Sequence, residues 1–166
     1  MSDEWARAFA LQAVSDLQVH ALLASSTSDK CRKLHLLQMA AENTCKAYLI
    51  ARSGYDALSK MYCVIAKTLP LIFRETLIQQ RHSEASIRTR VKFAKLLGAE
   101  IQLLSPSCNS GGTREGNSEY PWLTQSGTVG IPCQFPFSNI AQSDRHFISF
   151  IKLLSAAAQS YAAEND

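Results

Sequence analysis

The chain has 166 residues, of which 46% are hydrophobic and 19% are charged, and its formal net charge at pH 7 is +3. A chain of this length can bury a core without disulfides or metal ions, so we expect one domain covering residues 1–166. No apolar run approaches the roughly 20 residues of a membrane span, and the start MSDEWARAF lacks the basic and then apolar pattern of a signal peptide. We therefore expect a cytoplasmic protein and exclude the membrane-spanning class.

The charge is distributed unevenly along the chain. Residues 30–95 contain thirteen bases and four acids, whereas residues 1–29 contain one base and four acids and residues 96–166 contain three bases and six acids. A basic middle segment can present a positive surface to phosphate groups. The acidic ends can equally neutralise it in the folded protein, so the sequence leaves both interpretations open.

Cysteine and histidine spacing argues against a metal centre. The cysteines are odd in number and none are paired as CxxC, and the histidines lack the close spacing of zinc ligands. We expect free thiols that behave as small buried hydrophobic side chains, and we expect no metal and no cofactor. These residues are Cys31, Cys45, Cys63, Cys108 and Cys133, and His20, His35, His82 and His146.

The first two predicted helices cover residues 3–24 and 30–53 and are joined by a short polar turn, which predicts antiparallel neighbours. The second helix has apolar residues at i, i+3, i+7, i+11 and i+14, and further apolar residues widen this stripe. It should therefore lie at the centre of a bundle. Its stripe is Leu34, Leu37, Ala41, Cys45 and Tyr48, and its narrow polar strip, which is either a solvated edge or a site, is His35, Gln38, Glu42 and Lys46.

The third and fourth predicted helices cover residues 57–79 and 83–104. Pro70 should kink or break the third, because proline removes a hydrogen bond and clashes with the preceding turn. Ser83 is a suitable N-cap for the fourth helix. Gly98 in the middle of that helix costs about 1 kcal/mol relative to alanine, which indicates a close helix contact there. The fourth helix has the cleanest core stripe: Ile87, Val91, Ala94, Leu97, Ile101 and Leu104.

Residues 105–143 contain five of the seven glycines and four of the five prolines, so they cannot form a regular helix. Long loops in compact domains are usually functional or disordered. The aromatic-rich part, residues 120–137, should pack against the bundle, and Ser126-Gly127 allows a short hairpin. A fifth helix over residues 144–162 closes an all-α, antiparallel up-and-down bundle of four to five helices.

Part of the second helix resembles the HEPN family, the helical nucleotide- and RNA-binding bundles of prokaryotes. One branch of that family has Gln-Met-Ala-Ala-Glu followed by Lys-Ala-Tyr-Leu, as residues 38–42 and 46–49 do here. Uncharacterised relatives in that branch also resemble residues 119–122 (EYPW), Pro132 and residues 135–137 (FPF), which precede the last helix. This resemblance implies a HEPN-like bundle that binds nucleotide or RNA, forms a homodimer, and pairs with a nucleotidyltransferase as in toxin–antitoxin systems.

Active HEPN ribonucleases share a motif in which an arginine is followed, after four to six residues, by a histidine. The histidine transfers protons and the arginine stabilises phosphate charge. No arginine–histidine pair here has this spacing: two residues separate Arg32 from His35, seven separate Arg74 from His82, and Arg81 is adjacent to His82. If the site is a degenerate ribonuclease site, the position that the missing histidine would occupy is that of Tyr62, or that of Ser86 or Ile87. We therefore expect no catalytic residues and lean towards a protein without enzymatic activity.

The candidate ligand-binding residues are basic side chains with no evident role in stabilising their helices. Arg32 and His35 lie at a helix start, where positive charge opposes the helix dipole, so they can serve a phosphate or pair with an acidic neighbour. Arginine or lysine recurs every seven residues from Arg74 to Lys95, which on a continuous helix would match a phosphate backbone. The predicted phosphate- or RNA-binding set is Arg32, His35, Arg81, His82, Arg88 and Lys95. Two alternatives remain, a homodimeric interaction module without nucleic-acid binding and a ribonuclease with a rearranged site.

Overall fold

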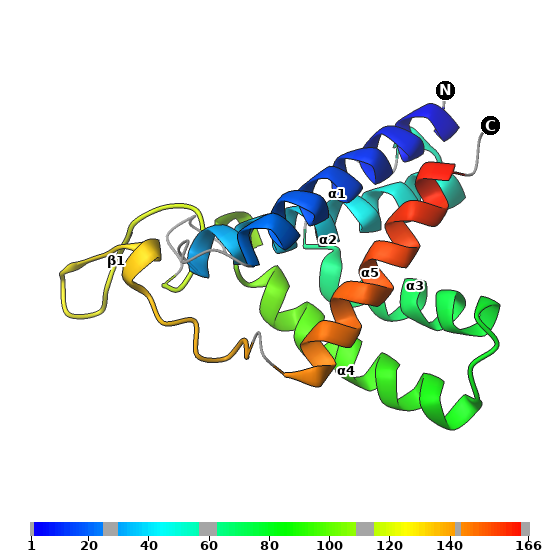
Figure 1. Ribbon diagram of the computed structural model, residues 1–166. Coiled ribbons are helices and arrows are strands. Elements are labelled where there is room, and N and C mark those ends of the chain that lie inside the picture. Colours follow the sequence, from blue (N-terminus) through cyan, green and yellow to red (C-terminus); the bar gives the residue numbers. More distant parts are fainter. Residues whose placement is uncertain (1, 25–29, 57–62, 109–114, 142–143, 164–166) are drawn as a thin grey trace.

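The computed structural model describes residues 2–24, 30–56, 63–108, 115–141 and 144–163 (Figure 1). In these ranges the chain forms five long helices: α1 (Ser2–Ala24), α2 (Lys30–Ser53), α3 (Ile65–Gln79), α4 (Glu84–Gln102) and α5 (Arg145–Ala163). The other elements are the 3-10 turns η2 (Pro106–Cys108) and η3 (Pro132–Gln134) and a hairpin of β1 (Trp122–Leu123) and β2 (Val129–Gly130). The predicted all-α bundle is confirmed.

α1 and α2 lie side by side and run in opposite directions (Figure 1). Their interface contains a buried carboxylate, Asp16, which accepts hydrogen bonds from the amides of Gln12 (2.8 Å) and Asn43 (3.3 Å). A buried charge is tolerated when hydrogen bonds replace the lost water. The start of α1 meets the end of α5, where the Arg7 guanidinium donates to the Ala162 carbonyl at 3.2 Å.

α2 is the central helix, as its apolar pattern predicts. Leu34, Leu37, Ala41 and Cys45 are fully buried, and Tyr48 is 5% exposed. The helix contacts α1, α3, α4 and α5. Burying a leucine side chain stabilises the fold by about 1.5–3 kcal/mol. The wide apolar surface of α2 is therefore the main source of cohesion between the helices.

A polar cluster joins the end of α2 to α3. The Tyr48 hydroxyl donates to Glu75 Oε1 at 2.9 Å, and the Arg52 guanidinium donates to Glu75 Oε2 at 2.6 Å. Arg52 also lies over the Tyr48 ring, 4.5 Å from its centroid. Burial and the hydrogen bond to Glu75 raise the pKa of Tyr48, so this side chain stays a donor at neutral pH.

The predicted third helix is wrong at its start, and of the kink or break predicted at Pro70, the break does not occur. α3 begins at Ile65, after Cys63 in a left-handed conformation (φ +56°), and the predicted residues 57–62 lie outside the described chain. α3 also continues through Pro70 without a break. The reason is position and packing: proline removes only one hydrogen bond near the helix start, and buried Leu69 and Ile72 hold the chain on both sides of it.

α4 begins where the capping signal predicts. The Ser83 side chain accepts a hydrogen bond from the Ser86 N–H at 3.4 Å, and its backbone is extended, as an N-cap requires. The core stripe faces α3, with Ile87, Ala94 and Ile101 buried. A Cβ at Gly98 would lie 3.8 Å from the Ile65 carbonyl oxygen, so the predicted close helix contact at this glycine is confirmed.

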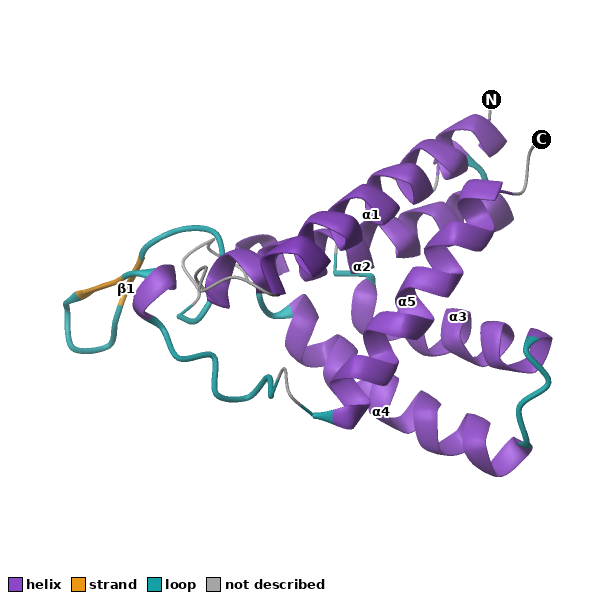
Figure 2. Cartoon of the chain, viewed as in Figure 1, coloured by secondary structure: helices purple, strands orange, loops and turns teal. Residues whose placement is uncertain are grey.

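The segment between α4 and α5 extends from one end of the bundle (Figure 2), and its residues Phe135 and Phe137 belong to or pack against the hydrophobic core. The predicted hairpin is present, with Trp122 opposite Gly130, and Gly127 in the connection has φ +79°. Phe135 makes edge contacts with Trp122 (centroids 5.3 Å apart) and with Phe137 (5.0 Å). The start of α2 holds this segment, because the Lys30 ammonium donates to the Pro136 and Phe137 carbonyls at 2.9 Å each. No helix in the described ranges is long and apolar enough to cross a membrane.

Candidate nucleic-acid interface

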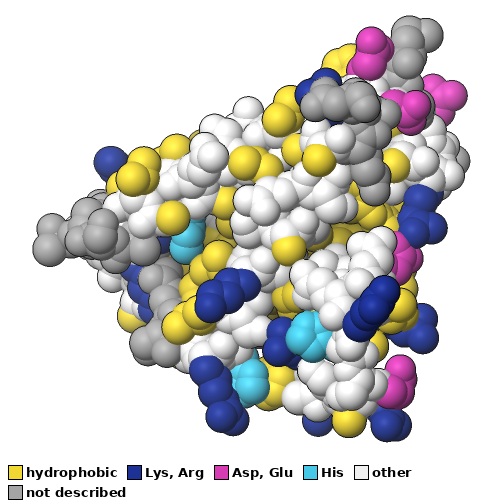
Figure 3. Space-filling model, turned by 45° about the vertical axis from the view of Figure 1, so that its right-hand side comes forward, with side chains coloured by type: hydrophobic (Ala, Val, Ile, Leu, Met, Phe, Trp, Pro, Cys, Tyr) yellow, Lys and Arg dark blue, Asp and Glu magenta, His cyan; other side chains and the backbone are white. Residues whose placement is uncertain are grey.

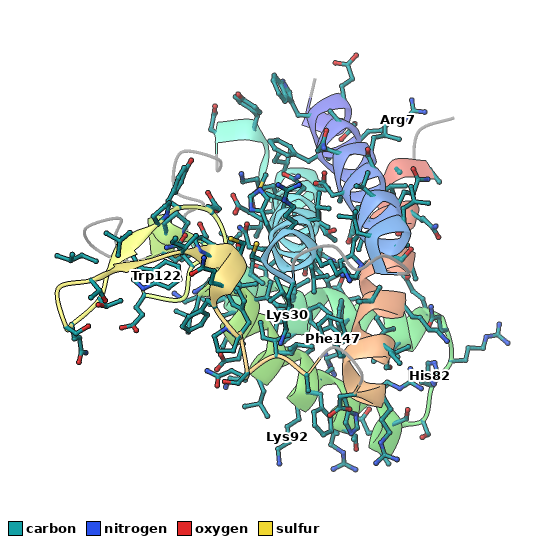
Figure 4. The ribbon with its side chains drawn as sticks, turned by 60° about the vertical axis from the view of Figure 1, so that its left-hand side comes forward. Arg7, Lys30, His82, Lys92, Trp122 and Phe147 are labelled. Carbon is teal, nitrogen blue, oxygen red and sulfur yellow. The ribbon has the colours of Figure 1, made fainter. Side chains whose placement is uncertain are left out.

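Three cations form one exposed row on α4. Arg88, Lys92 and Lys95 occur at i, i+4 and i+7, so their side chains project from the same exposed side of the helix, away from the buried stripe. We call these three residues the α4 basic stripe. Figure 4 shows Lys92 directed away from the body of the molecule.

The α4 basic stripe is not neutralised by the fold. None of its three side chains makes an ion pair or hydrogen bond with any residue that the structure describes. On one face of the molecule, lysine and arginine side chains gather in the lower half, while acidic side chains lie at the upper end and along one margin (Figure 3). The two open interpretations of the basic segment are thus resolved for α4, where the positive charge faces solvent.

Two adjoining pockets border α4, one beside the segment that follows it and one on the side of α5. One has a volume of about 190 Å³ and lies against Phe135, Phe137 and Ile140; the other has a volume of about 230 Å³. Both pockets include Glu100 of α4 and Asn139 from the segment before α5. We call the second pocket the α4–α5 groove; its lining includes Phe93, Leu97, Glu100, Asn139, His146 and Phe147.

An aromatic pair forms one wall of the α4–α5 groove. The rings of Phe93 and His146 are stacked with centroids 3.6 Å apart and an angle of 13° between their planes. Each ring is half-buried, and Arg145 donates from Nε to His146 Nε2 at 3.4 Å. The groove is therefore lined by two aromatic side chains and by apolar side chains, and the α4 basic stripe lies on the same helix.

The structure places Arg81 and His82 in the turn between α3 and α4. Arg81 has a left-handed backbone (φ +58°), its N–H bonds to the Ile78 carbonyl, and the His82 N–H bonds to the Leu77 carbonyl. This pair of hydrogen bonds is the Schellman arrangement that ends many helices, usually with glycine at the left-handed position. The local backbone around these residues is explained by helix termination.

Arg32 and His35 lie at the other end of the molecule, on the first turns of α2 beside the hairpin segment (Figure 1). Arg32 is exposed. His35 Nδ1 lies 3.9 Å from Glu119 Oε1, beyond hydrogen-bond distance, so an acidic neighbour is close but is not hydrogen-bonded to this histidine. Burial raises the pKa of Glu119, against the opposing effect of His35. The six predicted ligand-binding residues do not gather in one cleft: only Arg88 and Lys95 share a face.

The positions considered for a degenerate ribonuclease site have structural roles. Ile87 is 5% exposed in the core, and the Ser86 N–H binds the Ser83 cap. Tyr62 lies outside the described residues. The two described positions at which such a site would need its histidine, Ser86 and Ile87, therefore do not provide one.

The polar strip of α2 is an internal chain of hydrogen bonds. The Gln38 amide, 1% exposed, donates to Glu42 Oε2 at 2.8 Å, and Lys46 pairs with Glu42 Oε1 at 2.7 Å, as the i, i+4 spacing predicts. The segment after α4 packs across the first residues of this strip, so the strip is largely covered.

All five cysteines carry free thiols, and three of them depart from the expected burial. Cys63 and Cys108 are half-buried, and Cys133 is exposed. Burial and a hydrogen bond with the Cys63 thiol raise the pKa of Cys108 to about 12. Within the described ranges, no group of three or more histidine, cysteine or acidic side chains is placed to hold a metal ion.

Sequence reasoning missed the residues that form the α4–α5 groove. One signal for Phe93 was available in the sequence: it lies outside the core stripe of α4. A large aromatic side chain off that stripe needs another packing partner. His146 appeared only among the four histidines that lack the spacing of zinc ligands. Glu100 and Asn139 carried no signal, because their proximity depends on how the long segment returns to α4.

Comparisons of the chain with protein-family models, with curated proteins and with solved structures find no significant match. The fold and the surface together define a class, an all-α bundle with an exposed basic helix beside an aromatic-walled groove. The HEPN resemblance stays a prediction.

Proposed function

We propose that this protein binds nucleotide or single-stranded RNA through α4 and does not cleave it. The observation that carries this proposal is the α4 basic stripe, whose three cations face solvent and make no ion pair within the described chain. Cations aligned on one helix attract a phosphate backbone and release its counterions on binding.

The aromatic wall of the α4–α5 groove supports the same function. Proteins that bind single strands combine a positive surface for the backbone with aromatic side chains against which bases stack. Phe93 and His146 provide such a surface next to Lys92 and Leu96 on α4. A groove of about 230 Å³ suits a single base rather than a duplex.

The rest of the proposal comes from the HEPN resemblance. It describes a non-catalytic or degenerate member that acts in the cytoplasm as a homodimer, beside a nucleotidyltransferase partner in a toxin–antitoxin-like pair. The absence of an arginine–histidine pair at ribonuclease spacing supports the non-catalytic part. RNA cleavage that disappears in His82→Ala or His35→Ala would overturn that part and identify a ribonuclease with a rearranged site.

The test is titration of a fluorescent single-stranded RNA at several salt concentrations. We expect affinity to fall steeply with salt, and the triple variant Arg88→Ala/Lys92→Ala/Lys95→Ala to reduce the slope of log K against log salt by roughly 2–3. Alanine keeps α4 helical, so the loss reports charge. Arg32→Ala at the other end of the molecule is the matched control and should leave the slope unchanged. An absence of binding at low salt would refute the proposal.

A homodimeric interaction module is the second candidate. Two large apolar side chains two turns apart on α3, Leu71 and Ile78, are 53% and 49% exposed. Exposed apolar pairs on one helix face favour contact with another copy. Sedimentation of wild type and of Leu71→Ser/Ile78→Ser tests this, and dimers that dissociate in the variant while RNA binding is absent would favour the module.

A further inference from the structure

We propose that the α4–α5 groove is a base-specific subsite that takes guanine, with the Glu100 carboxylate accepting hydrogen bonds from the N1–H and N2–H groups of the base. This inference rests on the proposed function and adds the ligand class of the groove. Four observations carry it: the shape of the groove, the state of its two carboxylates, the position of Asn139, and the charge beside it.

The groove has the walls that a flat heterocycle requires. On one side stand the stacked rings of Phe93 and His146, and Leu97 and Phe147 add apolar surface. Phe147 is 4% exposed and belongs to the core, so this part of the wall is fixed. Ligand pockets of this kind bury an apolar body and orient it through a few polar groups.

Of the two carboxylates that line the groove, only one has both oxygens available. Asp144 Oδ1 accepts the His146 N–H at 2.7 Å, so Asp144 is tied to the start of α5, and one of its oxygens is already engaged. Glu100 makes no hydrogen bond or ion pair with any described residue, although it borders both pockets. An ionised carboxylate is acceptor-only, so a ligand that enters the groove must bring donors to it.

Guanine meets this requirement better than the other bases. Its pairing edge carries N1–H and N2–H side by side, which can bind both oxygens of one carboxylate. Adenine and cytosine each set an amino group beside a ring nitrogen that repels a carboxylate, and uracil sets a single N–H between two carbonyl groups. Hydrogen bonds to a charged acceptor are about twice as strong as neutral ones, and paired bonds add geometric specificity. Asn139 adds an amide that can both donate and accept.

The charge beside the groove fits a nucleotide and opposes a cationic peptide. Lys92 precedes Leu96, which lines the groove, by four residues on α4, so the Lys92 side chain lies next to that wall. A lysine- or arginine-rich partner would also provide donors for Glu100, but the α4 basic stripe would repel it. The combination of one free carboxylate and neighbouring cations therefore selects an anionic ligand with a donor edge.

The experiment is competition of the four nucleoside monophosphates and inosine monophosphate against a fluorescent single-stranded RNA bound to the full chain. We expect GMP to compete about tenfold better than AMP, CMP or UMP, and inosine monophosphate, which lacks the N2 amino group, to fall between them. Glu100→Gln should abolish the preference for GMP and leave AMP competition unchanged. Glu84→Gln removes the same charge from α4 outside both pockets and should retain the preference.

The outcomes separate this inference from the function on which it rests. Salt-dependent RNA binding without a preference for GMP, or a preference that survives in Glu100→Gln, would overturn the guanine subsite and leave RNA binding intact. Competition by an arginine-rich peptide but by none of the nucleotides would overturn it in favour of a protein ligand. An absence of RNA binding at low salt would overturn both proposals.

Discussion

The imidazole of His146 stacks on the phenyl ring of Phe93, with ring centroids 3.6 Å apart and an interplanar angle of 13°. This contact joins the first turn of α5 to the middle of α4, and it forms the wall shared by the α4–α5 groove and a smaller pocket behind it. Because α5 follows a long irregular segment, the stack helps to determine where that helix begins on the bundle.

Removing the stack should weaken the fold measurably. His146→Ala is expected to lower the free energy of unfolding by about 1 kcal/mol, the typical contribution of a stacked pair beyond its buried area. Urea denaturation followed by circular dichroism measures this change. His146→Phe, which preserves a ring, should retain most of the stability, and an alanine variant as stable as wild type would contradict the role of the stack.

Gly98→Ala should stabilise the protein. The added Cβ would lie 3.8 Å from Ile65 and Leu69, an ordinary contact distance, while alanine favours the helix by up to about 1 kcal/mol over glycine. Thermal unfolding should show a higher midpoint. Gly98→Leu is the control, because its larger side chain would meet α3 and lower the midpoint. Destabilisation by alanine would show that α3 and α4 approach more closely.

Gly130→Ala should disrupt the hairpin. A Cβ at this position would lie 2.5 Å from the Trp122 ring, and Trp122, at 3% exposed, has no free space in which to move. In a Trp5→Phe background Trp122 is the only tryptophan, so its emission should shift to longer wavelength as the ring becomes exposed. Gln125→Ala in the exposed hairpin connection should leave the emission unchanged, and an unshifted Gly130→Ala spectrum would refute the close contact.

Arg81→Gly should raise stability by about 0.5–1 kcal/mol. Arg81 has φ +58°, a conformation that costs non-glycine residues roughly 1–2 kcal/mol and that glycine adopts freely, although glycine loses more backbone entropy on folding. Arg81→Ala removes the same charge but keeps the strain, so the comparison of the two variants by urea denaturation isolates the backbone effect. Equal stability of both variants would contradict it.

His20 should make the protein less stable in weak acid. Burial, together with the positive charge of Lys33, lowers the pKa of His20 below its ordinary value of 6.5. As pH falls below 6.5, the unfolded chain therefore binds a proton before the folded protein does, and folding stability decreases until the lowered pKa is passed. Urea midpoints measured from pH 7.5 to 5 should decline in wild type and in His82→Gln, and less steeply in His20→Gln. Identical profiles for all three would exclude His20 as the cause.

The sequence predicted the helices well where the prediction depends only on residues close together in the chain. The bounds of α2 and the Ser83 cap of α4 are confirmed, because capping and a 3.6-residue period depend on neighbours within one or two turns. Of the kink or break predicted at Pro70, the break does not occur, because buried Leu69 and Ile72 hold α3 together through contacts with other helices, which no local rule includes.

The candidate site shows the same division. The sequence alone determined that the chain is helical, that α2 is central, and that Arg88 and Lys95 lie on one face, since each follows from spacing along a single helix. Only the tertiary structure decided that Arg32 and Arg81 lie at opposite ends, and that Glu100, Asn139 and His146 border one groove. These relationships depend on the packing of the helices and on the return path of the segment after α4, and both are set by long-range contacts.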